Sequence, residues 1–246
     1  MVVLKDADSK NVAYKRVLLK LSGEALTAVD GKILNGAFLE RISAEIKKCA
    51  DMGVQFAIVI GAGNIWRGSR QGGLNIDRVR GDHMGMLATV INSLAMQDYL
   101  IKAGLKTRVM SAFEISQVCE PYSQYKAMDA LASGEAVIIP CGVGYPFFST
   151  DTGMMLRAAE LSCEIALSAR NVDGVYDKDP NKHTDAQKYD VLTYDEALKQ
   201  NLKALDAAAV AVGRENNIKT IVFALENPEN ITKVITGDRV GTLLTN

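Results

Sequence analysis

Several short segments of this chain are apolar along nearly their whole length, and stretches with helical periodicity separate them. The apolar segments span 16–21, 54–60, 108–110, 136–141, 164–168, 220–223 and 240–244. A strand with one face in water alternates apolar and polar residues, whereas a strand covered on both faces does not need to. The continuous apolar runs therefore predict a mostly parallel sheet that is buried on both sides.

The intervening segments have the spacing of amphipathic helices. In 37–51, for example, Phe38, Ile42, Ile46 and Cys49 recur on one stripe. The remaining helix candidates are 83–103, 123–133, 151–162, 195–200, 206–216 and 229–236. Alternating strands and helices predict an α/β fold, a three-layer α/β/α sandwich. Ligands bind beyond the carboxyl ends of the strands in such sheets, so residues that follow the apolar runs are candidate site residues.

Length and charge narrow the class of protein. With 246 residues and neither repeat nor linker, one catalytic domain over 15–246 is expected, with 1–14 as an N-terminal tail. Charged residues interrupt that tail, which excludes a signal peptide, and no apolar run is long enough to span a membrane. A formal net charge of −1 gives no basic field for nucleic acid or a membrane surface. Four cysteines without a CxxC pair suggest buried free thiols in a reducing cytosol, so we expect a cytoplasmic protein.

Lys20 lies at the end of the first apolar run and is followed by Ser22 and Gly23. A lysine beside such a turn is suited to bind polyphosphate. The alternative is a lysine that snorkels from the strand end to the surface.

The second run continues as GAGNIWRG, which contains Gly61, Gly63 and Arg67. The glycines allow a ligand to approach the backbone closely, and Arg67 has the right chemistry for a phosphate. The dinucleotide fingerprint GxGxxG fails because Trp66 occupies its third glycine position, and the chain has no Walker A pattern. A purely structural turn is the alternative.

Two aspartates and one helix start have both a structural and a functional interpretation. Asp82 and Asp206 each precede helical patterns, where capping is the common role, but Asp82 would also suit ribose hydroxyls. The loop GVGYPFFSTD leads into a helix at Ser149, which would act as an N-cap or, with the first N–H groups, as an anion site. Further on, Asp173-Gly174 marks a turn and Tyr176 offers a flat face for a base.

Five segments taken together resemble the bacterial-type uridylate kinase family, within the amino-acid-kinase superfamily. They are KLSGEAL, IGAGNIWRG, GDHMGMLAT, GYPFFSTD and VDGVYDKDP, in that order, and the resemblance covers residues 15–246. The resemblance implies transfer of the γ-phosphoryl group of ATP to UMP, giving UDP and ADP in pyrimidine nucleotide biosynthesis. It also implies Mg²⁺ as cofactor with ATP, a homohexamer, and allosteric control, which members of the family often show toward GTP and UTP.

The same resemblance implies a role for individual residues. Catalysis would involve Lys20, Arg67, Asp151 and Asp206. ATP would contact Lys20, Leu21, Ser22, Gly23, Gly63, Arg67, Asn171, Tyr176 and Asp179. UMP would contact Ala62, which replaces a glycine common in the family, together with Asp82, Val143, Gly144, Tyr145, Pro146, Phe147, Phe148, Ser149 and Thr150. No protein ligand of the metal is assigned.

Two rival functions are a related kinase that acts on a carboxylate or carbamate, and a nucleotide-sensing module without catalysis. The GYPFFSTD loop and Asp82 favour a nucleotide acceptor over a carboxylate. A sensing module would not need Lys20, Arg67, Asp151 and Asp206 together.

Overall fold

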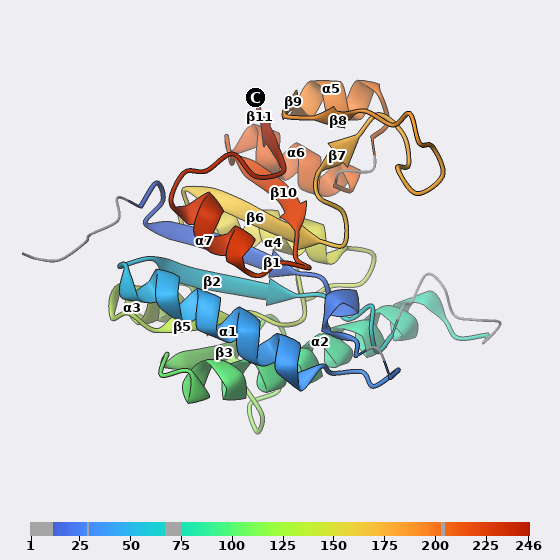
Figure 1. Ribbon diagram of the computed structural model, residues 1–246. Helices are drawn as coiled ribbons and strands as arrows, with labels where there is room; N and C mark the ends of the chain where they lie inside the picture. Colours follow the sequence, from blue (N-terminus) through green and yellow to red (C-terminus); the bar gives the residue numbers. More distant parts are fainter. Residues whose placement is uncertain (1–11, 29, 67–74, 203–204) are drawn as a thin grey trace, which may run out of the picture.

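A computed structural model describes residues 12–28, 30–66, 75–202 and 205–246, and within them one large sheet dominates (Figure 1). Its nine strands lie in the order β4-β3-β5-β2-β1-β6-β10-β11-β9. The strands are β1 (Arg16–Leu21), β2 (Gln55–Ile60), β3 (Thr107–Ser111), β4 (Glu120–Pro121), β5 (Ala136–Ile138), β6 (Ile165–Arg170), β9 (Val191–Thr193), β10 (Thr220–Ala224) and β11 (Thr242–Thr245). Neighbouring strands are parallel except β10 and β11. A separate antiparallel hairpin joins β7 (Val175–Tyr176) to β8 (Lys188–Tyr189).

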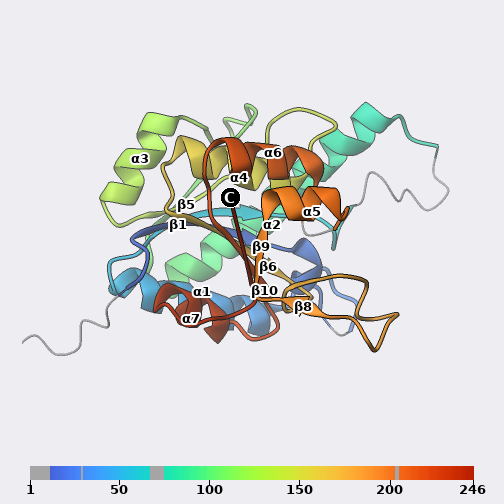
Figure 2. The ribbon, with the colours of Figure 1, turned by 90° about the horizontal axis from the view of Figure 1, so that it is seen from above.

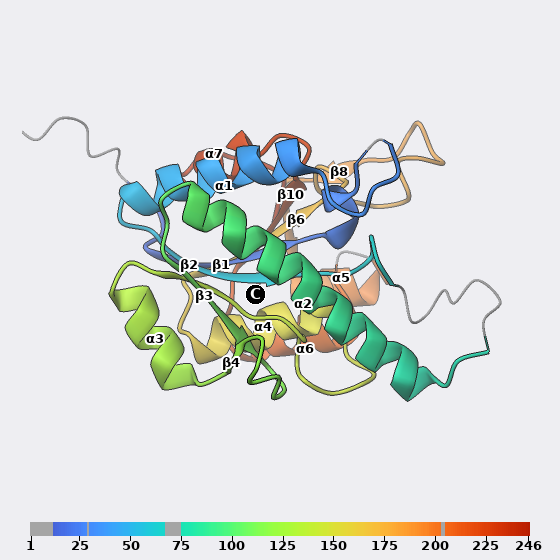
Figure 3. The same cartoon turned by 90° about the horizontal axis from the view of Figure 1, so that it is seen from below.

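Helices cover both faces of this sheet (Figure 2). Buried apolar side chains of α1 (Gly36–Asp51), α2 (Arg78–Lys102) and α7 (Glu229–Ile235) form one core with the strands. Those of α3 (Gln124–Ala132), α4 (Thr150–Glu160), α5 (Tyr194–Lys199) and α6 (Ala207–Glu215) form a second core on the other face. Helices α1 and α2 lie side by side (Figure 3). The predicted three-layer α/β/α sandwich with a mostly parallel sheet is confirmed.

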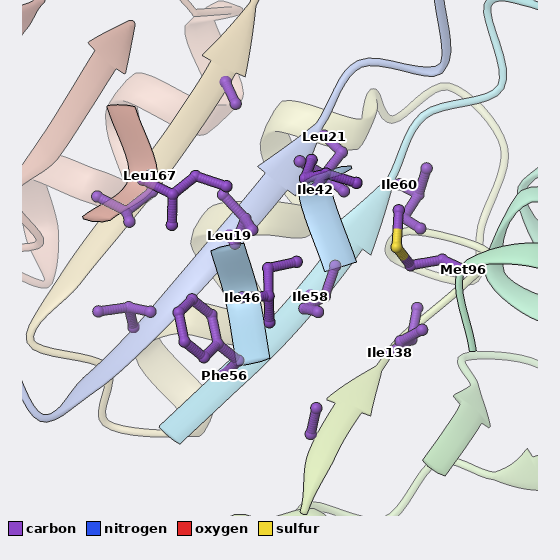
Figure 4. Packing of buried hydrophobic residues seen from close by; sticks show 14 of the residues in the cluster. Leu19, Leu21, Ile42, Ile46, Phe56, Ile58, Ile60, Met96, Ile138 and Leu167 are labelled. Carbon is purple, nitrogen blue, oxygen red and sulfur yellow. The ribbon is translucent and has the colours of Figure 1, made fainter. Parts of the chain in front are cut away.

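Alternation along β1 directs its side chains to the two cores. Leu19 and Leu21 face Ile42 and Ile46 of α1 in the first core (Figure 4). Leu18 belongs to the second core. Because neighbouring residues of a strand point to opposite faces, Lys20 shares the face of Leu18, toward α4. All of β1 from residue 17 onward is buried because helices cover both sides of it.

The order of the strands places a ligand site at the end of β1. The chain leaves β1 for β2 on one side of it, and later returns to form β6 on the other. Such a reversal of strand order opens a crevice beyond the carboxyl ends of the strands, where α/β proteins bind ligands.

Some element boundaries differ from the prediction. Helix α2 begins at Arg78, five residues before the expected start at 83. The two-residue β4, the edge strand β9 and the 3₁₀ helix η1 (Gly23–Leu26) had no clear signal in the sequence. The four cysteines are free thiols, and three of them are buried. No helix in the described part of the chain is both long and apolar enough to cross a membrane.

Candidate active site

A buried cluster of opposite charges lies at the carboxyl ends of the central strands. Lys20 of β1 is only 9% exposed, and its Nζ lies 3.1 Å from Asp151 Oδ1. The other carboxylate oxygen of Asp151 accepts a hydrogen bond from Arg170 Nη2 at 2.5 Å. A buried lysine needs such a counter-ion because desolvation disfavours its charge. The surface-snorkelling interpretation of Lys20 is therefore wrong.

The environment shifts the pKa values in this cluster. Burial lowers the pKa of Lys20, although the charge of Asp151 opposes the shift. Burial alone would raise the pKa of Asp151, but the charges of Lys20 and Arg170 outweigh it and hold that pKa below its ordinary value. Asp151 is therefore an anion at neutral pH, and two basic side chains share it.

Asp206 fixes the start of α6 beside the cluster. Its Oδ1 accepts hydrogen bonds from the backbone N–H groups of Ala208 and Ala209, both at 3.0 Å, so the N-cap interpretation is confirmed. The hydroxyls of Ser149 and Thr152 also donate to this carboxylate, which ties α6 to the start of α4. The charge of Asp206 acts on Lys20 as well and favours its protonated form.

The turns after β1 and β2 pack backbone against backbone. A Cβ on Gly23 would lie 2.3 Å from the carbonyl oxygen of Gly61, so only glycine fits there. Gly61 N–H donates to the carbonyl of Leu21 at 2.9 Å. Leu21 and Gly23 thus lie directly beside Gly61, and main-chain groups from both turns meet at the end of the sheet.

The larger of two cavities at this edge, which we call the aromatic-loop cavity, has a volume of about 520 Å³. It is lined by Glu24, Ala62, Gly63, Trp66, Arg78, Gly81, Asp82, Gly85, Met86, Thr89, Cys141, Gly142, Val143, Tyr145, Phe147, Phe148, Ser149 and Thr150. Eight of the ten residues expected to contact UMP are among them, while Gly144 and Pro146 are not. Gly63, expected beside ATP, also lines this cavity.

Asp82 lies inside α2 and does not cap it. The N-cap is Asp77, whose side chain accepts a hydrogen bond from Arg80 N–H. The capping interpretation of Asp82 is therefore wrong, because the helix starts earlier than its apolar pattern suggested. The Asp82 carboxylate instead accepts hydrogen bonds from Arg78 Nε at 2.9 Å and from Phe147 N–H at 2.8 Å, and it points into the aromatic-loop cavity.

The loop that forms one wall of this cavity presents aromatic side chains to solvent. Tyr145 is 70% exposed, Phe147 66% and Phe148 52%. Phe147 has a φ of 72°, an unfavourable backbone conformation for this residue, and its bond to Asp82 helps to hold it. Ser149 then caps α4 by accepting from the N–H groups of Asp151 and Thr152, which confirms its N-cap interpretation.

The second cavity, which we call the hairpin cavity, has a volume of about 380 Å³. It is lined by Arg170, Val172, Gly174, Val175, Tyr176, Asp177, Lys178, Asp179, Pro180, Lys182, Gln200, Asn201, Leu202 and Val222. Tyr176 and Asp179 lie here as expected, and the Tyr176 hydroxyl donates to Asp173 at 2.6 Å. Asn171 is not part of the lining, and its side chain instead donates to Glu24.

Two arginines of this site were missed by the sequence analysis. Arg170 ends an apolar strand just as Lys20 does, and that shared signal could have found it. Arg78 precedes Asp82 by four residues, the spacing of an ion pair on a helix. Arg67, a predicted catalytic residue, lies outside the described residues.

Comparisons with known proteins agree with this architecture. The model of the amino acid kinase family matches residues 15–224. A uridylate kinase of Xanthomonas oryzae pv. oryzae is 47% identical over 238 residues, which is 95% of this chain and 97% of the relative. The crystal structure of UMP kinase from Bacillus anthracis has a TM-score of 0.90 at 38% identity and covers 94% of this chain and 96% of its own. UMP kinase from Ureaplasma parvum has a TM-score of 0.89 at 36% identity, with coverage of 95% and 99%. The chain therefore belongs to the amino acid kinase family.

Proposed function

We propose that this protein is a UMP kinase, which transfers the γ-phosphoryl group of ATP to UMP and releases UDP and ADP. The observation that carries the proposal is a basic cluster located between two cavities. Arg170 belongs to the cluster and lines the hairpin cavity. Asp151 belongs to it as well and directly follows Thr150, which lines the aromatic-loop cavity. The close relatives named as uridylate and UMP kinases support the same activity.

We assign ATP to the hairpin cavity and UMP to the aromatic-loop cavity. Tyr176 would offer a flat face to the adenine, and Asp179 lines the same cavity. In the aromatic-loop cavity, the Asp82 carboxylate is placed to accept hydrogen bonds from ribose hydroxyls. Thr150 lines this cavity and directly precedes Asp151 of the cluster, and Ala62 of the turn after β2 lines it as well, so we place the UMP phosphate beside these two residues.

The chemistry needs alignment and positive charge more than a base. An oxygen of the UMP phosphate forms a bond to the γ-phosphorus, and the bond from that phosphorus to the β–γ bridging oxygen breaks, so ADP leaves. The UMP phosphate is largely ionised near neutral pH, so no general base is required. Lys20, with main-chain N–H groups of the turns after β1 and β2, would stabilise the charge that develops between the phosphates. Arg67 is assigned to the transferring phosphoryl group on family resemblance alone.

We assign Mg²⁺ to the phosphates of ATP, with water completing its coordination. Asp151 is shared by two basic side chains, and Asp206 accepts hydrogen bonds from two backbone N–H groups and two hydroxyls. The described residues contain no group of three or more acidic, histidine or cysteine side chains suited to a metal. Because these carboxylates are already engaged, the site suits a Mg²⁺ ion that arrives bound to ATP. The ion would neutralise part of the phosphate charge.

The rival functions fit these cavities less well. An acceptor that carries a carboxylate would meet the negative charge of Asp82 in the aromatic-loop cavity, whereas ribose hydroxyls would donate to it. A sensing module would not need a buried lysine that shares its counter-ion, Asp151, with Arg170 of the hairpin cavity.

We further propose, on family resemblance, that the protein is a cytoplasmic homohexamer of single-domain subunits under allosteric control. Apolar side chains that α2 exposes support self-association: Leu87 is 48% exposed and Ile91 47%. They are one turn apart and form a stripe that a second copy of the helix would cover. Light scattering at micromolar protein should give a mass of about six chains, and a monomer would contradict the proposal.

A coupled assay of ADP formation tests the activity. UMP, CMP, GMP, AMP, carbamate and acetylglutamate are compared at equal concentration, with Mg²⁺ and with excess EDTA. We expect rapid turnover of UMP alone, and none in EDTA. Equal turnover of CMP, or a preference for carbamate or acetylglutamate, would contradict the proposal.

A further inference from the structure

The two basic side chains hold Asp151 in unequal ways. Arg170 Nη2 donates to Oδ2 at 2.5 Å, which is a short charge-assisted hydrogen bond. The Lys20 ammonium lies farther away, 3.1 Å from Oδ1, and the attraction between the two charges contributes more to this pair than their hydrogen bond does. The guanidinium is therefore the firmer counter-ion, and Lys20 is held mainly by charge.

Arg170 is also fixed from behind. Its Nε donates to the hydroxyl of Ser168 at 2.9 Å, and Ser168 is fully buried in the same strand. Strand β6 pairs with β1 on one side and with β10 on the other, so the backbone beneath Arg170 is rigid. The guanidinium is planar and always charged. Anchored in this way, it keeps its ion pair with Asp151 even when Lys20 moves away.

We propose that Arg170 is a positioning residue that keeps Asp151 paired while Lys20 turns from this carboxylate to the phosphates of the donor nucleotide. The inference rests on the proposed phosphoryl transfer. When the Lys20 ammonium moves from Asp151 to a phosphate, the carboxylate loses one of its two counter-ions, and a buried carboxylate that loses its only counter-ion is strongly disfavoured. Without Arg170, Asp151 would retain Lys20 in the resting pair. With Arg170, the ammonium can leave and the carboxylate stays neutralised.

This role differs from two simpler ones in its dependence on Asp151. A purely structural Arg170 would affect stability and leave turnover unchanged. An Arg170 that only binds phosphate would weaken nucleotide binding, and its effect would multiply with that of any change at Asp151. A positioning role predicts instead that removing the carboxylate charge releases Lys20 and relieves the loss caused by removing Arg170.

The test measures kcat at saturating ATP and UMP for R170Q, R170K, D151N and the double variant R170Q/D151N. We expect R170Q to lower kcat about 10- to 100-fold, as for outer-shell groups that orient a metal ligand. R170K should recover part of this loss. The double variant should have a kcat no lower than that of R170Q, whereas losses that multiply in the double variant would overturn the proposal. Should R170Q fail to fold, R170K and R170K/D151N give the same comparison.

Two measurements separate the simpler roles. Calorimetry with ADP alone should give a dissociation constant for R170Q close to that of the wild type, and much weaker ADP binding with an unchanged kcat would overturn the proposal. R214Q removes an arginine from an exposed ion pair with Asp195 and is the matched control, with an expected kcat equal to that of the wild type. Wild-type UDP formation tests the proposed function by itself. The ratios of kcat among the variants test the role of Arg170, and they can be measured with any acceptor that the wild type phosphorylates.

Discussion

The two cavities at the end of the sheet are assembled in different ways. Most of the hairpin cavity comes from one stretch of chain, 170–182, with Gln200, Asn201, Leu202 and Val222 added. The aromatic-loop cavity collects residues from four stretches that lie between Glu24 and Thr150. The first is a local structure at the end of one strand, whereas the second exists only when α2, the turn after β2 and the loop before α4 come together. We therefore expect substitutions in the two cavities to have different effects on nucleotide binding.

The largest effect is expected where the cavities meet. Lys20→Ala should lower kcat by about 10²–10³, the usual cost of removing one preorganised electrostatic group from a transition state. The fold should survive because Asp151 keeps Arg170 as its counter-ion. The measurement is kcat at saturating ATP and UMP, with the melting temperature alongside. Lys47→Ala, which removes a half-buried lysine from its ion pair with Asp51 on α1, is the control. A near-normal kcat would remove Lys20 from the site.

The next effect should be confined to the aromatic-loop cavity. Asp82→Asn should weaken UMP binding by about 1.5–3 kcal/mol, because hydrogen bonds to a charged group are lost, and this corresponds to a rise in KM of roughly 10- to 150-fold. The KM for ATP should stay constant. Asp51→Asn removes an exposed ion pair with the same spacing on α1 and serves as control. An unchanged KM for UMP would contradict the assignment of this carboxylate to the ribose.

A smaller effect on stability is expected at the cap that joins α6 to α4. Asp206→Ala should cost about 0.5–2 kcal/mol of unfolding free energy, whereas Asp206→Asn retains an acceptor oxygen and should cost only a few tenths. Denaturant unfolding of both variants measures this. If Asp206→Asn also lowers kcat while its stability is retained, the negative charge itself acts on Lys20. Equal stability of the Ala variant and the wild type would rule out the cap as a stabilising contact.

The smallest of the four effects belongs to the hairpin cavity. Tyr176→Ala should raise the KM for ATP by about 2- to 10-fold, because one aromatic contact is worth roughly 0.5–1.5 kcal/mol. The KM for UMP should not change. Tyr125→Ala, on the exposed face of α3, is the matched control. A rise in the KM for UMP instead would show that the two cavities are assigned the wrong way round.

The contrast between the cavities also shows what sequence can predict. Apolar runs predicted the sheet, and Lys20 was found because a charge at the end of such a run is unusual. Arg170 has the same signal and was overlooked, while its partner Asp151 lies 19 residues away and meets it only through the fold. The N-caps Ser149 and Asp206 were predicted by local chemistry. The start of α2 was placed too late because its first three residues, Arg78 to Arg80, are exposed and two of them are charged, so apolar periodicity does not reveal it.

The central claim is that the cavities bind different nucleotides on the two sides of one basic cluster, and crossed calorimetry tests it most directly. UMP and ADP are titrated separately into the wild type, Asp82→Asn and Tyr176→Ala. The account predicts that Asp82→Asn loses affinity for UMP alone and Tyr176→Ala for ADP alone. Loss of both ligands in a variant that remains folded, or of the opposite ligand in each, would contradict it.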